Sequence, residues 1–369
     1  MKIAVVTSYF PKSTRVYDGN SAVQTLKHLQ SRAEIEVFCP IATYPRIRRF
    51  APPAYRPEDP NFRPPHFTTT YVSYPAIAGL SRAINGRTLT ARILPLLRAA
   101  KPDLILNYWL YPDGYAAVAS ARKLSVPSIV CAIGSDLRAR NDAVTKRLVR
   151  QTMRRADAVI TVSEELRKVA LDEGIAPAKV STILNGCDHN IFHPGDRAEA
   201  RRELGISQDS KVILFVGSLL ETKGLRELIE AFRQLPNTSL AIVGQGPFEA
   251  HLKDRDGVLL AGRQDANGVA RWMRACDVFC LPSYSEGCPN VVVEALSCGR
   301  PVVATNVGGI PELVNESCGI LVPPRDAGKL RAGLESALAR SWPTGSMFTR
   351  SWEDVANETF ALCQRVLEH

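Results

Sequence analysis

The sequence predicts an α/β protein made of two doubly wound, Rossmann-like domains, each with a parallel sheet covered by helices on both faces. Two observations support this fold class. Short apolar runs rich in Val and Ile alternate with longer amphipathic segments, which is the pattern of parallel strands buried on both sides and joined by helices. The alternation stops at residues 194–205 and then starts again, and a chain of 369 residues is long enough for two domains of ordinary size.

The first domain is predicted to span residues 1–195. Amphipathic periods at residues 22–30, 88–100 and 143–155 indicate helices. The predicted strands are short and end at Gly, Pro, Ser or Asn. They cover residues 3–7, 35–39, 103–107, 128–133, 158–162 and 180–184.

The second domain is predicted to span residues 206–345, and a last helical period covers residues 352–369. Ligands of doubly wound sheets bind beyond the carboxyl ends of the strands. We therefore expect the two domains to face each other across one cleft, formed by their strand ends at Ser8, Gly134, Gly217, Gly244 and Pro282. The strands of this domain are predicted at residues 212–216, 240–243, 258–261, 277–281, 301–305 and 319–322.

Composition and residue spacing narrow the class of protein. Hydrophobic residues make up 45% and charged residues 22%, which are globular values. The apolar runs are too short for a signal peptide or a membrane span, so we expect a cytoplasmic or peripheral protein. The nine cysteines lack CxxC pairs and often fall in strands, which favours reduced core residues. His189 and His193 lie in a Gly/Asn/Pro loop, and we interpret them as surface residues in preference to a zinc pair.

The segment around Glu286 carries most of the functional signal. Glu286 lies in a loop after a predicted strand, and Glu294 follows on a predicted helix. Pro289 suits the first helical position, so the amides of Gly287 and Cys288 should face the helix mouth, where phosphate binds. Carboxylates beside a phosphate repel it unless they bind hydroxyls. The ligand should therefore be anionic and polyhydroxylated, as a nucleoside diphosphate sugar is. Alternatively, Glu286 is an acidic residue stabilised by the helix dipole.

Lys223 marks a second candidate position. It precedes the predicted helix LRELIEAF, and a cation at the positive end of a helix suggests an anion between them. The other interpretation is a solvated lysine. The surrounding GSLLETKG is not a P-loop, because no Ser or Thr follows the lysine, and no GxGxxG follows any predicted strand.

Several segments together resemble one family. The two glutamates separated by seven residues, VILFVGSLLETKGLRELIEAF, LAIVGQGP, ILNGCDHNIFHP, NYWLYPDGYAA and IGSDLR occur in the order found in retaining glycosyltransferases of family 4, which have the GT-B fold. The resemblance implies that helix 352–369 packs back on the N-terminal domain, that Glu286 and Lys223 are catalytic, and that neither a metal nor a cofactor is needed. It further implies acceptor-side roles for Asp18, Tyr108, Asp113 and Asp136. The implied donor-binding residues are Gly19, Gly217, Ser218, Lys223, Gly244, Gly246, Arg263, Gln264, Glu286, Gly287, Cys288, Pro289, Asn290 and Glu294.

The implied activity is retaining transfer of a hexose-type sugar from a UDP- or GDP-sugar to a saccharide or polyprenyl-linked saccharide, in bacterial surface polysaccharide or exopolysaccharide synthesis. Two alternatives remain open: a non-catalytic or weakly active homologue that binds nucleotide sugar, and a nucleotide-sugar epimerase or phosphorylase on a related scaffold. The chain departs from the family pattern at three positions, with Ser218 in place of Arg, and Ile133 and Tyr108 in place of His. The donor base, sugar, acceptor, linkage and oligomeric state are not fixed by the sequence.

The formal charge of +9 suggests an acidic partner. One interpretation is a solvated basic surface, and the other is adhesion to anionic lipids on the cytoplasmic face of the inner membrane. Nucleic acid is not expected, because no binding module is recognisable. The basic residues in question are Arg46, Arg48, Arg49, Arg56 and Arg63 in a Pro-rich loop, and Arg147, Arg150 and Arg154 on one helical face.

Overall fold

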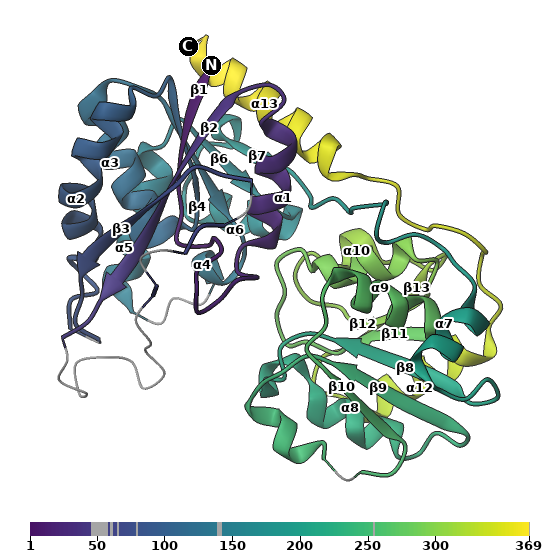
Figure 1. The fold of residues 1–369 in the computed structure, drawn as a ribbon. Coiled ribbons are helices and arrows are strands. Elements are labelled where there is room, and N and C mark those ends of the chain that lie inside the picture. The colour runs from purple at the N-terminus through teal and green to yellow at the C-terminus, as the bar shows by residue number, and fades with distance from the viewer. Residues whose placement is uncertain are drawn as a thin grey trace. The chain divides into compact units, whose positions relative to one another are not determined.

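Two compact units make up the chain in the computed structural model, which describes residues 1–45, 58–59, 62–64, 66–78, 80–138, 142–253 and 255–368. The first unit comprises Met1–Leu184 and Trp352–His369, and the second comprises Asn185–Ser351. Each contains one parallel sheet with helices on both faces, so the predicted fold class is confirmed. Both are drawn in Figure 1.

The first unit has a seven-stranded sheet in the order β3-β2-β1-β4-β5-β6-β7. Six of these strands were predicted, and β3 (Thr69–Pro75) was not. This edge strand alternates polar residues with the buried Val72 and Tyr74, and so lacks the continuous apolar run of its neighbours. The other strands are β1 (Lys2–Val6), β2 (Glu34–Thr43), β4 (Leu104–Tyr108), β5 (Ser128–Ala132), β6 (Ala158–Thr161) and β7 (Val180–Thr182).

Helices α2 and α3 cover one face of this sheet, where Leu89, Ile93 and Leu97 of α2 enter the core with Ala4 and Val6 of β1. On the other face, α13 lies alongside α1 (Figure 1). The helices of this unit are α1 (Asn20–Leu29), α2 (Asn85–Ala100), α3 (Tyr115–Leu124), α4 (Ser135–Arg138), α5 (Ala143–Arg155), α6 (Glu164–Asp172) and α13 (Trp352–Leu367).

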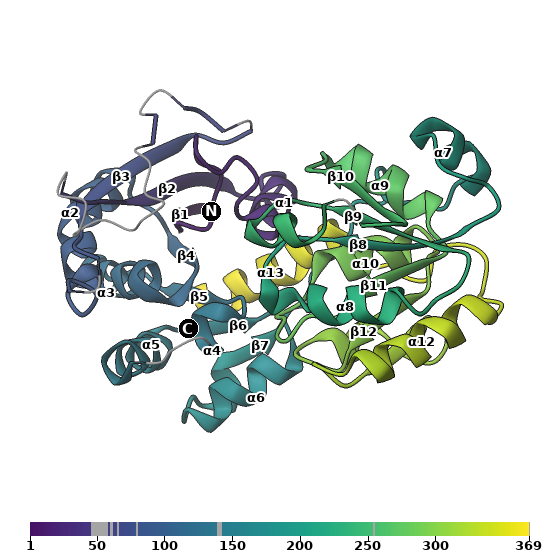
Figure 2. The same ribbon diagram turned by 90° about the horizontal axis from the view of Figure 1, so that it is seen from below.

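The second unit has a six-stranded sheet in the order β10-β9-β8-β11-β12-β13, and all six strands were predicted. Helices α8 and α12 pack together on one side, while α7 and α9 lie on the other (Figure 2). The strands are β8 (Lys211–Val216), β9 (Thr238–Val243), β10 (Val258–Gly262), β11 (Val278–Leu281), β12 (Val302–Thr305) and β13 (Gly319–Val322). The helices are α7 (Arg197–Leu204), α8 (Leu225–Phe232), α9 (Ala266–Ala275), α10 (Asn290–Ser297), α11 (Ile310–Leu313) and α12 (Ala327–Ala339).

The boundary after the first unit lies between Leu184 and Asn185, earlier than the predicted end at residue 195. Hydrogen bonds explain the difference. The Asn185 amide donates to the Cys288 carbonyl at 2.9 Å and to Asn290 Oδ1 at 2.8 Å, and the Cys187 N–H donates to the Arg350 carbonyl at 3.0 Å. Residues 185–195 therefore belong to the second unit.

Strand order reverses once in each sheet. The first strand of the chain's first sheet, β1, is flanked by β2 and β4, and β8 is flanked by β9 and β11 in the same way. In open parallel sheets the ligand crevice opens at this switch point, beyond the carboxyl ends of the strands. The loops that follow β1 and β4 in one unit, and β8 and β11 in the other, are therefore where functional side chains are expected.

Candidate functional site

The two predicted catalytic residues meet at the switch point of the second unit. Lys223 comes from the loop after β8 and Glu286 from the loop after β11, and Lys223 Nζ lies 2.6 Å from Glu286 Oε1. The two side chains are 26% and 12% exposed. The ion pair is thus partly shielded from water but still open to a ligand, and residues 63 positions apart in the chain form one charged group.

Glycine at position 224 allows the two loops to touch. Gly224 has φ +69°, and a Cβ there would lie 2.0 Å from the carbonyl oxygen of Pro282 at the end of β11. The Tyr284 N–H donates to the Thr222 carbonyl at 2.9 Å and joins the same two loops. Lys223 is the last residue of a short 3₁₀ turn, and α8 begins two residues later, at Leu225. The backbone therefore fixes where the lysine side chain begins.

A second pair of loops is held by the predicted glycine turn. A Cβ on Gly244 would lie 1.9 Å from the Gly217 carbonyl oxygen, and one on Gly246 would lie 2.4 Å from the Leu219 carbonyl oxygen. The Leu219 N–H donates to the Gln245 carbonyl at 2.9 Å. The loops after β8 and β9 thus approach at backbone distance, which only residues without a side chain permit.

A pocket of about 280 Å³ lies at these strand ends. Five predicted donor-binding residues line it, namely Gly217, Ser218, Gly244, Arg263 and Gln264. The Gln264 side chain is oriented by a 2.7 Å hydrogen bond from its amide to the Ala261 carbonyl. Gln245 and Val269 also line the pocket and were not predicted. Gln245 stands inside the glycine turn, so the sequence signal for it was present, whereas nothing in the sequence distinguishes Val269.

The mouth of α10 differs in detail from the prediction. Pro289 is the N-cap, with ψ 115°, and the helix begins at Asn290, so Pro289 is not the first helical residue. The Gly287 carbonyl accepts from the Gly309 N–H at 2.9 Å. Burial raises the pKa of the Cys288 thiol to about 12, so this cysteine stays protonated and is a packing residue. Asn185, which bonds to Cys288 and Asn290, was missed, although it stands in the ILNGCDHNIFHP segment.

Glu294 lies half-buried on α10, between Val293 and Ala295, which are both buried. Burial raises the pKa of its carboxyl to about 7. Among the residues that the structure describes, no side chain or backbone N–H donates to this carboxyl. A carboxylate that has lost part of its hydration without a compensating donor is a strong candidate to accept hydrogen bonds from a ligand.

At the switch point of the first unit the central group is Asp113. It follows β4, is fully buried, and accepts from the Ser8 N–H, after β1, at 2.5 Å. Its other oxygen, Oδ1, has no partner in the described part of the chain, and burial raises its pKa to about 6. Gly19 supports the same loop, because a Cβ there would lie 2.2 Å from the Tyr9 carbonyl oxygen, and Asp18 pairs with Lys12 at 3.7 Å.

Two of the predicted acceptor-side residues, Tyr108 and Asp136, are buried and have partners within the first unit. Tyr108 is 6% exposed, its pKa is raised by burial, and its hydroxyl interacts with Thr25 of α1, so the side chain lies in the core. Asp136 is fully buried, and its carboxylate accepts from the N–H groups of Leu110, Ile133 and Gly134 at 2.9 to 3.1 Å. It ties the loops after β4 and β5 together.

His189 and His193 both lie beside backbone carbonyl groups of the second unit. His189 Nε2 lies 3.3 Å from the Arg350 carbonyl and His193 Nδ1 lies 2.9 Å from the Pro194 carbonyl. Within the described ranges, no three His, Cys, Asp or Glu side chains converge as metal ligands would. No helix among those same residues combines the length and apolar character that a bilayer crossing requires.

The predicted basic helix face is only partly available. Glu173 forms ion pairs with Lys146 at 3.1 Å and with Arg150, and its backbone carbonyl accepts from Arg154 at 3.5 Å. Arg147 is exposed. Arg46, Arg48, Arg49 and Arg56 lie outside the described residues.

Comparison with known proteins covers most of the chain. The family model described as "Glycosyltransferase Family 4" matches residues 19–191, and the one described as "Glycosyl transferases group 1" matches residues 210–340. TuaC of Bacillus subtilis, described as a teichuronic acid biosynthesis glycosyltransferase, is 29% identical over 339 residues, which are 89% of this chain and 86% of TuaC. D-inositol 3-phosphate glycosyltransferase of Mycobacterium tuberculosis is 30% identical over 233 residues, covering 57% of this chain and 48% of that protein.

Solved structures share the fold. Sucrose-phosphate synthase of Thermosynechococcus elongatus superposes with a TM-score of 0.81 at 20% identity, over the whole of both chains. Anabaena HepE, solved in complex with UDP-glucose, has a TM-score of 0.71 at 20% identity, over 100% of this chain and 98% of that one.

Proposed function

Since the chain belongs to the family 4, group 1 glycosyltransferases, with the GT-B fold, we propose that it moves a hexose-type sugar from a nucleoside diphosphate sugar to a saccharide acceptor, with retention of the anomeric configuration. The observation that carries this proposal is the Lys223–Glu286 ion pair, formed by the two loops that flank the switch point of the second unit. A cation for the diphosphate and a carboxylate for the sugar hydroxyls then lie side by side at the position where doubly wound domains bind ligands.

The chemistry follows from the charges that develop. The bond between the anomeric carbon and the phosphate oxygen breaks, and its electron pair goes to the leaving nucleoside diphosphate. The acceptor hydroxyl oxygen forms the new bond to the anomeric carbon from the same face, and its proton passes to the departing phosphate oxygen. Lys223 stabilises the leaving group, and Glu286 orients sugar hydroxyls and offsets the positive charge on the sugar. This scheme uses no metal and no cofactor.

The pocket beside this pair is where we place the nucleotide. Gly217 and Gly244 let a diphosphate approach the backbone. Ser218 stands where the family pattern has an arginine, and Arg263 supplies a second cation to the pocket instead. Glu294 is proposed to accept from the ribose hydroxyls, which would supply the donors its carboxyl lacks. The UDP-glucose complex of HepE supports UDP as the base-carrying group.

We propose that the first unit binds the acceptor, with Asp113 as its main polar group. A lipid-linked acceptor on the cytoplasmic face of the membrane is favoured by three exposed apolar side chains, Leu80, Ile84 and Val144, which are 74%, 50% and 52% exposed. Arg82 lies between Leu80 and Ile84 in the sequence and pairs with Asp142 at 3.6 Å. The exposed Arg147 lies three residues after Val144. Apolar side chains among arginines suit a shallow contact with anionic lipids. The similarity to TuaC supports surface polysaccharide synthesis.

The test measures release of free nucleoside diphosphate from UDP- and GDP-sugars, with and without a polyprenyl-linked acceptor. Glu286→Gln, which keeps the size and removes the charge, should lower turnover by about 10²- to 10³-fold. Lys223→Ala should weaken UDP binding far more than uridine binding. The matched controls are Glu221→Gln in the loop after β8 and Lys253→Ala, both exposed. Near-normal turnover by Glu286→Gln, or release that ignores the acceptor, would contradict the proposal.

A further inference from the structure

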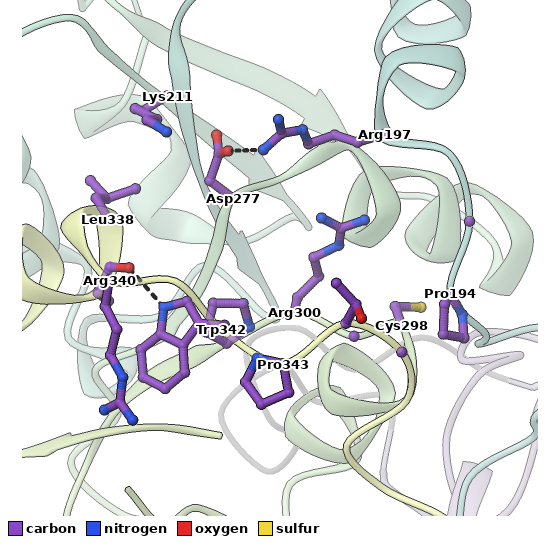
Figure 3. Close-up of a pocket in the computed structure, with 16 residues that line it drawn as sticks. Pro194, Arg197, Lys211, Asp277, Cys298, Arg300, Leu338, Arg340, Trp342 and Pro343 are labelled. Atoms are coloured by element: carbon purple, nitrogen blue, oxygen red, sulfur yellow. Dashed lines mark hydrogen bonds and ion pairs between the residues drawn. The ribbon is translucent and has the colours of Figure 1, made fainter. Parts of the chain in front are cut away.

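A second pocket of the second unit lies near the amino ends of the strands, at the opposite end of the sheet from Lys223 and Glu286. Its volume is about 620 Å³, and its lining includes Lys211 at the start of β8, Asp277 just before β11, and Trp342 after α12 (Figure 3). Lys211 and Asp277 lie at the amino ends of β8 and β11, whereas the proposed donor pocket lies beyond the carboxyl ends of the strands. Because β8 has six residues, the two pockets are about 20 Å apart along the sheet.

The pocket is strongly basic. Four cationic side chains line it, and Asp277 is its only carboxylate among the lining residues that the structure describes. Both oxygens of Asp277 are already engaged, since Oδ1 accepts from Arg197 at 2.5 Å, and Oδ2 accepts from Arg201 and from the Val212 N–H, each at 2.7 Å. The cationic lining residues are Arg197, Lys211, Arg300 and Arg340.

Cys298 does not add a negative charge. Its thiol lines the pocket, and burial raises its pKa to about 12 despite the nearby arginines. It is therefore neutral at physiological pH, and Asp277 alone among the described lining residues offsets part of the positive charge of the pocket.

Two of the cations, Lys211 and Arg300, have no acidic partner among the described residues. In the described part of the chain neither Lys211 nor Arg300 forms an ion pair, and the buried Nε of Arg300 has no hydrogen-bond acceptor. Figure 3 shows the Arg300 side chain extending toward the Arg197–Asp277 pair, with Lys211 on the other side of Asp277. A buried donor without an acceptor costs about 1–3 kcal/mol, more when it is charged. A bound anion would supply the counter-charge that Lys211 and Arg300 lack among the described residues.

The remaining wall is apolar and fixed. The Trp342 indole N–H donates to the Ala337 carbonyl at 2.8 Å, and the Arg340 guanidinium lies 4.3 Å from the centre of the indole ring. Leu338 and Pro343 continue this wall. The volume lies within the range of about 300–1,000 Å³ typical of small-molecule sites.

We propose that this pocket binds a small, free, phosphate-bearing molecule at a site separate from the donor. Guanidinium groups present a planar fork of donors that matches phosphate oxygens, and Lys211 adds a point charge to the same group. The uncharged part of the ligand lies against Trp342 and Leu338. This assignment uses residues that the proposed transfer does not use, so it stands or falls independently of that reaction.

The test measures pyrophosphate binding to the full chain by titration calorimetry. Lys223→Ala serves as the background, because loss of this cation should weaken pyrophosphate binding at the proposed donor pocket. In that background pyrophosphate should still bind, and adding Lys211→Gln and Arg300→Gln should weaken the affinity at least tenfold. The matched control adds Lys253→Gln and Arg233→Gln, which remove the same charges from exposed positions outside this pocket. Thermal unfolding checks that each variant is folded.

Three results would overturn the proposal: no pyrophosphate binding in the Lys223→Ala background, equal binding with and without the Lys211 and Arg300 substitutions, or an equal loss in the control. A lipid headgroup is the other source of phosphate. If the Lys211 and Arg300 substitutions abolished binding to phosphatidylglycerol vesicles while leaving pyrophosphate binding unchanged, the pocket would bind membrane lipid and not a free molecule.

Discussion

Replacing Glu294 by Gln should stabilise the protein at high pH while weakening donor binding. In the folded chain, burial raises the pKa of Glu294 from an ordinary value of 4.5 to about 7. Between these two values the unfolded chain has lost a proton that the folded chain keeps, so stability falls as pH rises from about 4.5 to about 7. Below 4.5 both states are protonated and the residue has no effect. Above 7 the full penalty of the buried charge is present.

The size of the effect follows from the two pKa values. A difference between 4.5 and about 7 corresponds to about 3 kcal/mol, at about 1.4 kcal/mol per pKa unit. Glu294 is half-buried, and screening by water reduces the value to about 2 kcal/mol. For a domain of this size that is a rise of about 4–8 °C in the Tm of the second unit at pH 8. At pH 4 the variant and the wild type should differ little.

The assay is thermal unfolding of the wild type and Glu294→Gln between pH 4 and 8, with Glu316→Gln, at an exposed position, as the control. Titration of UDP-glucose should show at least tenfold weaker binding to Glu294→Gln, because an amide oxygen is a weaker acceptor for ribose hydroxyls than a carboxylate. If the two proteins lost stability in parallel from pH 4.5 to 7, burial of Glu294 would not be the cause of the pH dependence.

Three further predictions concern stability and membrane binding. Gly244→Ala should lower the free energy of unfolding by more than about 2 kcal/mol, since the new Cβ would lie 1.9 Å from a carbonyl oxygen. Gly205→Ala, whose Cβ meets nothing within 4 Å, should lower it by about 1 kcal/mol. Denaturant unfolding compares the two variants, and equal losses would contradict the steric reason. Arg201→Ala should lower stability by about 3–5 kcal/mol, because Arg201 is 2% exposed and pairs with Asp277, whereas the exposed Arg202→Ala should change it little in the same assay. Anionic vesicles should bind the chain and release it as the salt concentration rises. The double variant Leu80→Asp with Arg147→Glu should weaken that binding in a sedimentation assay. If binding depended on neither salt nor lipid charge, these residues would belong to an ordinary solvated surface.

The sequence by itself determined the two sheets and the position of the main functional loops. Hydrophobic runs such as residues 212–216 and 278–281 are local signals, because a parallel strand buried on both faces must be apolar along its whole length. Lys223 and Glu286 stand in the loops after such runs, at the carboxyl ends of strands, where ligands of doubly wound sheets bind. The edge strand β3 was not predicted, because its buried residues alternate with exposed ones and form no continuous apolar run.

Tertiary structure alone decided what each polar side chain meets. Asp113 and Asp136 follow neighbouring strands and look alike in sequence, yet Asp136 is saturated by three N–H groups while Asp113 keeps one oxygen without a described partner. Tyr108 ends a strand but points into the core, and Glu173 neutralises part of a helix face that appears uniformly basic in sequence. The basic pocket around Arg300 joins residues far apart in the chain. Such partners depend on long-range packing, for which neither periodicity nor spacing carries a signal.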